Sequence, residues 1–296
     1  MLKKLFGLAA SFAALVGLPA GAWAQTAKDA DPAIWVVKDA DTTIYLFGTV
    51  HVLKPGLSWF DEGVKAAFDK SDEVVLEMIE PDAATMQGVI IKAGLSMTGP
   101  GLSEKLPKES LPALAVAAKD LGMPESALER FEPWLAAMMS AMAPLSKYGY
   151  DPESGAERTI SAAAKAANKQ LIGIETFEQQ VGFFDGLPEE QQIKYLVTTL
   201  RDYEKAGPML DEMVANWAAG DPDTLATTMN DAMRENPEVA KVLLADRNAH
   251  WAEWIEQRMA KPGTVFMAVG AGHLAGDDSV QTWLAKRKLT ATRVQY

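Results

Sequence analysis

Four short apolar segments, each leading into a histidine or a glutamate, constrain the fold more than any other feature of this sequence. Each segment is rich in β-branched or aromatic residues, which favour strands. Long stretches of helical character separate them, and strands that alternate with helices in this way pair in parallel within one sheet. The pattern therefore predicts an α/β fold. The four segments span residues 42–47, 74–76, 171–174 and 264–269.

The other segments predict a mixed sheet with helical insertions. Residues 34–37 meet the first of the four strands through a short polar turn, which predicts an antiparallel hairpin, and residues 290–296 resemble a last strand. Two stretches, at about 82–147 and 178–260, are mostly helical in character and are interrupted by Pro and Gly. We therefore predict a central mixed β-sheet with flanking helices and large helical insertions, formed as one domain by residues 25–296.

The first 24 residues are typical of a secretory signal peptide. Lys3 and Lys4 precede an apolar stretch that ends near Pro19, and Ala22-Trp23-Ala24 forms an Ala-x-Ala cleavage site. The apolar stretch is shorter than the roughly 20 residues that span a bilayer. No cysteine follows the cleavage site, which excludes a lipoprotein anchor. We therefore expect a periplasmic or secreted protein with no stable membrane insertion after cleavage.

Charge and cysteine content exclude several classes of function. The formal net charge is −12 at pH 7, and such an acidic chain is a poor ligand for nucleic acid or anionic lipid. The sequence contains no cysteine, so zinc–thiolate sites, iron–sulfur clusters and cysteine nucleophiles are excluded. Any metal would have to be held by His, Asp, Glu or backbone oxygen atoms.

Two of the three histidines occupy the same sequence frame. His51 and His273 each complete a Gly-x-x-His motif at the end of an apolar strand, and Glu77 and Glu175 also end apolar strands. Ligands of α/β proteins bind at the carboxyl ends of parallel strands, so we expect all four side chains at that edge of the sheet. The alternatives are structural histidines held by backbone groups, and a Glu175-Thr176 pair that only helps to cap the next helix.

Two imidazoles with a carboxylate form a recurrent catalytic metal site that keeps an open coordination position. His51, His273 and Glu77 are therefore candidate ligands of a divalent metal, with Mn, Co and Zn left open. Glu175, or Glu77 if it is not a ligand, is the candidate general base.

A helix expected at about residues 239–259 carries two polar residues on its apolar face. Arg247 and Asn248 lie in one stripe with Trp251 and other large apolar residues, whereas His250 points away from the stripe and is expected at the surface. Arginine in such a stripe favours a paired anion or a substrate oxygen, and covering apolar surface is the alternative. We treat Arg247 and Asn248 as candidate catalytic residues, with Arg247 holding the substrate or stabilising an oxyanion.

Short motifs follow one another along nearly the whole predicted mature chain. They are Leu46-Phe47-Gly48-Thr49-Val50-His51, Leu76-Glu77, Tyr148-Gly149-Tyr150-Asp151, Gly173-Ile174-Glu175-Thr176 with Gln179-Gln180, Arg247-Asn248, and Val269-Gly270-Ala271-Gly272-His273-Leu274. This ordered set resembles the TraB/GumN family, which includes the TIKI proteins of animals.

The resemblance implies a fold related to the ChaN and erythromycin-esterase-like proteins, and a metal-dependent hydrolase. TIKI proteins are described as metalloproteases that use manganese or cobalt. By resemblance, the site is expected at His51, Glu77 and His273, with Arg247 and Asn248 nearby.

The leading hypothesis from the sequence is an exported metal-dependent hydrolase, with peptidase activity as its narrower form, acting on a peptide or small-molecule substrate. One alternative is a metal- or haem-binding protein in which the histidines are ligands without chemistry. The other is a non-catalytic cell-envelope accessory protein. The sequence predicts neither the substrate nor the oligomeric state.

Overall fold

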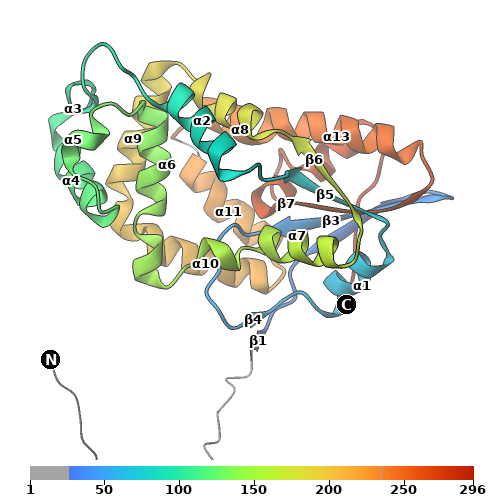
Figure 1. Ribbon diagram of the computed structural model, residues 1–296. Coiled ribbons are helices and arrows are strands. Elements are labelled where there is room, and N and C mark those ends of the chain that lie inside the picture. The colour runs from blue at the N-terminus through green and yellow to red at the C-terminus, as the bar shows by residue number, and fades with distance from the viewer. Residues whose placement is uncertain (1–26, 234) are drawn as a thin grey trace, which may run out of the picture.

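The computed structural model describes residues 27–233 and 235–296 (Figure 1). The predicted signal peptide, residues 1–24, lies outside the described residues, so it stays a prediction. Within the described ranges, no helix combines the length and the apolar character needed to cross a bilayer.

A six-stranded mixed sheet forms the centre of the fold, which confirms the predicted class. Its strand order is β6-β5-β7-β3-β2-β8. Strands β3, β5, β6 and β7 run parallel, while β2 pairs antiparallel with β3 and with β8. The strands are β2 (Ile34–Lys38), β3 (Thr42–Thr49), β5 (Glu73–Met78), β6 (Gln170–Glu175), β7 (Gly263–Gly270) and β8 (Thr292–Arg293). A separate parallel pair joins β1 (Lys28–Asp29) to β4 (Leu57–Ser58).

Strand β7 lies between the two strands that precede it in the sequence. β3 and β5 have the expected common direction, but β7 separates them and pairs with both. The register places Gly48 opposite Val269 and Thr49 opposite Gly270. The two Gly-x-x-His motifs therefore begin side by side, at the carboxyl ends of adjacent strands.

Helices cover both faces of the sheet, which buries most of the residues of the central strands. On one face, Met267 and Val269 of β7 cluster with residues of α13 (Asp246–Met259) and α14 (Val280–Lys286). On the other face, Phe266 of β7 clusters with α1 (Glu62–Lys70) and α7 (Ala156–Ala166). Figure 1 shows α13 along one side of the sheet and α1 and α7 on the opposite side. This alternation of side chains is why the strand segment reads as continuously apolar.

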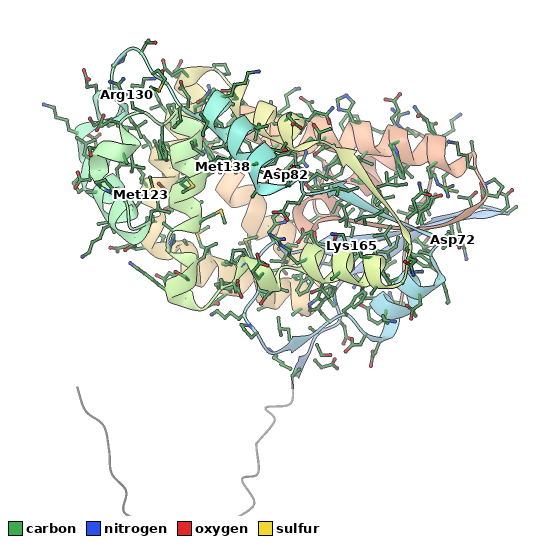
Figure 2. The ribbon with its side chains drawn as sticks, in the orientation of Figure 1. Asp72, Asp82, Met123, Arg130, Met138 and Lys165 are labelled. Atoms are coloured by element: carbon green, nitrogen blue, oxygen red, sulfur yellow. The ribbon has the colours of Figure 1, made fainter. Side chains whose placement is uncertain are left out.

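The two predicted helical insertions are confirmed, and they pack against each other through α6 and α9. Figure 1 shows most of these helices beyond the end of the sheet toward which the parallel strands point, and Figure 2 labels Met123, Arg130 and Met138 among them. The first insertion contains α2 (Ala83–Gly94), α3 (Leu102–Lys105), α4 (Leu111–Asp120), α5 (Glu125–Leu128) and α6 (Pro133–Met142). The second contains α8 (Phe177–Asp185), α9 (Glu189–Arg201), α10 (Ala206–Ala218), α11 (Pro222–Met233) and α12 (Pro237–Ala240), and leads into α13.

Candidate functional site

The parallel strands bring the predicted side chains to one edge of the sheet. Glu77 is next to last in β5, Glu175 ends β6, and His51 follows β3 by two residues. His273 lies in a short 3₁₀ helix, η6 (Ala271–Leu274), directly after β7. Arg247 reaches the same edge from the first turn of α13, just after a π-helical turn at Lys241–Ala245, and such turns are frequent beside functional sites.

Arg247 lies at the centre of the buried part of this cluster. Its Nε and Nη2 donate to the two carboxylate oxygens of Glu175 at 2.9 and 2.7 Å, and Nη2 also donates to Oε2 of Glu77 at 2.6 Å. Nη1 donates to the carbonyl of Leu243 at 3.2 Å and to Nε2 of His273 at 3.1 Å. A guanidinium has five N–H donors, so all five are used within the protein. Arg247 therefore has no donor left for a substrate oxygen, the role expected from the sequence.

His273 is a buried, neutral histidine with a fixed tautomer. Its Nδ1 lies 2.6 Å from Oδ1 of Asn248, whose amide nitrogen donates to the carbonyl of Asp278 at 2.7 Å. The bond to Asp278 fixes the orientation of the Asn248 amide, so that its oxygen, an acceptor, faces Nδ1 of His273. Nδ1 therefore carries the proton, and Nε2 keeps the lone pair that accepts from Arg247. Burial, with the nearby positive charges, lowers the pKa of His273 to about 3 despite the attraction of Glu77. Asn248 thus orients His273 from within the predicted apolar stripe.

Glu77 is an ionised carboxylate with one oxygen directed toward Gly270. Its Oε1 accepts the backbone N–H of Gly270 at 2.7 Å, and its Oε2 accepts from Arg247 and from Gln180. Burial favours the neutral acid, but the surrounding donors and positive charges outweigh it and lower the pKa of Glu77 to about 2. A Cβ atom on residue 270 would lie 3.2 Å from Oε1 of Glu77 and 3.6 Å from Nε2 of His51. The glycine therefore leaves room between these two atoms.

Glu175 connects α8 and α13, and both of its carboxylate oxygens accept hydrogen bonds from side chains of these helices. Its Oε1 accepts from Arg247 and from Nε1 of Trp251 at 2.9 Å, and its Oε2 accepts from Arg247 and from Gln180 at 3.0 Å. Only 8% of the side chain is exposed. The following helix α8 is capped by Thr176, as the capping alternative for Glu175-Thr176 expected, whereas the carboxylate of Glu175 takes no part in the cap.

The exposed part of the site is an ion pair between His51 and Glu157. Nδ1 of His51 lies 2.6 Å from Oε1 of Glu157, which also accepts the hydroxyl of Thr49 at 2.5 Å. The His51 side chain is 71% exposed, and that of Glu157 is 24% exposed. The carboxylate of Glu157 raises the pKa of His51 to about 9. Burial disfavours ionisation of Glu157, but its pairing with His51 lowers its pKa.

Glu157 was not among the residues singled out from the sequence. It lies in the first turn of α7, where an acidic residue is common because it complements the helix dipole. That weak signal does not distinguish Glu157 from any other helix-start acid. Its partners Thr49 and His51 are more than 100 positions away in the chain, so only the folded structure reveals the pair.

Gly155 allows α7 to approach His51 closely, and its substitution gives a stability prediction. A Cβ atom on residue 155 would overlap the carbonyl oxygen of His51. Gly155→Ala must therefore separate two main-chain segments, and we expect a loss of about 1–3 kcal/mol in the free energy of unfolding. Gly182→Ala in α8 is the control, because its Cβ would meet no atom within 4 Å, and it should gain about 0.5–1 kcal/mol. Urea unfolding measures both, and equal effects would contradict the close approach.

A model of the TraB/PrgY/gumN family matches residues 33–293. The chain belongs to this family. Among curated proteins, it is similar to the uncharacterized protein YbaP of Escherichia coli, with 24% identity over 253 residues that cover 86% of this chain and 92% of YbaP. An uncharacterized protein of Treponema pallidum is 22% identical over 269 residues, covering 86% of this chain and 80% of that protein. No solved structure matches this TraB/PrgY/gumN protein significantly.

The three predicted metal ligands do not fit a metal ion as this TraB/PrgY/gumN chain arranges them. Among residues 27–233 and 235–296, no three His, Asp or Glu side chains are grouped so as to hold an ion. The lone pair of Nε2 in His273 and Oε2 of Glu77 both accept from Arg247. A divalent cation between them would meet the guanidinium charge. Metal dependence stays a prediction, and it requires Arg247 to move.

Proposed function

We propose that this chain is an exported hydrolase of esters or amides, peptides included, in which His51 is the general acid and Glu77 activates water. The observation that carries the proposal is the 2.6 Å contact between Nδ1 of His51 and Glu157. It orients an imidazole that is 71% exposed and leaves its Nε2 unpaired with Glu157, on the side of Gly270 where Oε1 of Glu77 also lies. An acid and a base that face each other across a small gap are what hydrolysis of an acyl compound needs.

The proposed reaction balances within this pair. A water molecule beside Oε1 of Glu77 gives a proton to the carboxylate while its oxygen attacks the acyl carbon. The bond from carbon to the leaving oxygen or nitrogen breaks, and Nε2 of His51 protonates the leaving atom. A proton then returns from Glu77 to His51 through solvent. Proton donation by a positioned acid contributes typically about 100- to 10,000-fold in rate, whereas Glu77, with its pKa near 2, is a weak base that mainly orients the water.

Glu77 fits the role of base better than Glu175, the other candidate from the sequence. Every oxygen of Glu175 accepts two hydrogen bonds from protein donors. Among the residues that the structure describes, Oε1 of Glu77 accepts a hydrogen bond only from the N–H of Gly270, so one of its lone pairs is available to a water molecule. The proposal therefore assigns Glu175 to holding Arg247 and Glu77 to the reaction.

The proposed location outside the cytoplasm rests on residues 1–24. The two lysines, the apolar stretch and the Ala-x-Ala site have the order of a signal peptide. Mass spectrometry of the protein recovered from a periplasmic fraction would test it. The expected new N-terminus is Gln25, and a chain that keeps Met1 would contradict export by cleavage.

Activity is tested on a panel of nitrophenyl esters and a panel of fluorogenic peptides, each with and without EDTA. We expect at least one compound to be hydrolysed with EDTA present. The control is a chain with both site histidines, His51 and His273, changed to alanine. A folded parent chain that cleaves nothing in either panel would sink the proposal, and cleavage that EDTA abolishes would favour the metal-dependent form.

The pH dependence of the reaction should follow the proton on His51. Because His51 acts as an acid and its pKa is raised to about 9, activity should hold through neutral pH and fall as the pH rises through about 9. Glu157→Gln removes the main cause of the raised pKa, so the fall should move toward the ordinary histidine value of about 6.5. Initial rates from pH 6 to 10 measure the shift.

Glu153→Gln is the matched control for this profile. Glu153 lies four residues before Glu157 and is 73% exposed, with Arg158 as its partner. Its substitution should leave the profile where it is. A Glu157→Gln profile that coincides with the parent would show that the imidazolium of His51 is not the acid.

A further inference from the structure

We propose that Arg247 is the permanent cation of this site, holding the position between Glu77 and His273 that a divalent metal would need, so that the site operates without a metal ion. The inference rests on the contacts around Arg247 and does not require that the chain be a hydrolase.

The guanidinium donates hydrogen bonds to the same atoms that a metal ion would need as ligands. Nη1 is 3.1 Å from Nε2 of His273, and Nη2 is 2.6 Å from Oε2 of Glu77. The two acceptors belong to one cluster, because Nε2 of His273 is only 3.8 Å from Oε1 of Glu77. A lone pair that accepts an N–H cannot at the same time bind a metal. Arg247 therefore satisfies these acceptors in place of an ion.

His273 cannot offer its other nitrogen instead. Nδ1 faces Oδ1 of Asn248 at 2.6 Å, and the amide of Asn248 is itself fixed by the carbonyl of Asp278. Flipping the ring would place a carbon against Asn248 and would also lose the contact with Arg247. The arrangement thus commits both nitrogens of His273 to protein partners.

Arg247 is held too firmly to be displaced at low cost. Its side chain is 10% exposed, and its Cζ lies 4.7 Å from the ring centre of Trp251 and 5.4 Å from that of Phe183. Aromatic faces stabilise a cation, and arginine stays charged at every accessible pH. All five N–H donors of the guanidinium are used where it lies, so moving it would break hydrogen bonds that the site does not replace elsewhere.

The donors that remain are too few for a metal site. Of the predicted ligand set, Nδ1 of His51 is paired with Glu157, which leaves Nε2 of His51 and one lone pair on Oε1 of Glu77. Structural and catalytic zinc sites use three or four protein ligands. Two donors beside a fixed guanidinium charge fall short of that number.

The first test measures metal binding by the parent chain without any substrate. The chain, produced without a histidine tag and treated with chelator, is titrated with MnCl₂, CoCl₂ and ZnCl₂ in a calorimeter. We expect no saturable binding at one equivalent in the micromolar range. Binding of one equivalent that is lost in His273→Ala and kept in His250→Ala would overturn the inference, because His250 is an exposed histidine outside the site.

The second test removes the resident cation. Arg247→Ala frees Glu77, Glu175 and His273 together, so the folded variant should gain one Co²⁺ with a visible ligand-field absorption that Arg247→Ala/His273→Ala lacks. A folded Arg247→Ala chain that binds no Co²⁺ would contradict the idea that Arg247 occupies the metal position. If this variant does not fold, the parent titration still decides. Lack of hydrolysis would contradict the proposed function alone, since neither titration involves catalysis.

Discussion

Arg247→Met should lower the free energy of unfolding by about 3–5 kcal/mol, because it leaves buried carboxylates without their cation. Glu77 and Glu175 are only 12% and 8% exposed, and both bond to the guanidinium. Methionine fills a similar length of side chain but donates no hydrogen bond. A loss of this size is a large fraction of the roughly 5–15 kcal/mol that stabilises a typical domain. Urea unfolding followed by tryptophan fluorescence measures it.

Arg158→Met is the matched control for this experiment. Arg158 also bridges two carboxylates, Glu80 at 2.8 Å and Glu153 at 3.3 Å, but its side chain is 47% exposed. Water screens such a pair, so its removal should cost less than about 1 kcal/mol. Equal losses for Arg158→Met and Arg247→Met would show that burial does not set the strength of the Arg247 cluster.

The pH dependence of the Arg247→Met loss provides a second check. In the parent, the pKa of Glu77 is near 2, below its unfolded value, so Glu77 contributes stability above about pH 4.5 that is lost as the pH falls toward 2. Without Arg247, burial favours the protonated form of Glu77. The variant should therefore take up a proton on folding at mildly acid pH, and the stability gap should narrow between pH 7 and pH 5.

The strands were predictable because both faces of the sheet are buried. Residues 264–269 are all apolar or small for that reason, and the hairpin of residues 34–37 and 42–47 is a local feature. The position of β7 between β3 and β5 was not predictable, since it depends on pairing between distant segments. Strand pairing also overrode a local sequence signal for the start of a helix. Ser58-Trp59-Phe60-Asp61 resembles a capping box, yet Ser58 belongs to β4 and the helix begins at Glu62.

The site, too, has features that were predictable from the sequence and features that depend on long-range contacts. His51, Glu77, Glu175 and His273 could be placed together because parallel strands end at one edge. Arg247 could be expected to meet an anion because it lies in an apolar stripe, and it meets two. The number of donors it uses, and the pairing of His51 with Glu157, depend on side-chain geometry across several elements. Sequence spacing carries no information about such contacts.

His51→Gln should lower kcat/KM about 100- to 10,000-fold on any compound that the parent hydrolyses. Glutamine keeps a polar side chain of similar size, but it cannot donate a proton to a leaving group. The stability of the protein should fall by less than about 1 kcal/mol, because the ion pair with Glu157 that is lost involves a side chain that is 71% exposed. A large fall in rate with only this small loss of stability would separate chemistry from folding.

His250→Gln supplies the control for that measurement, since His250 is exposed on α13 and outside the cluster. It should match the parent in both rate and stability. Because Glu157 acts only through His51, adding Glu157→Gln to His51→Gln should cause no further fall in kcat/KM at neutral pH. If the two residues acted independently, the fold-losses in kcat/KM of the single variants would multiply in the double variant. That result would show that Glu157 contributes to the reaction by a route that does not pass through the imidazole.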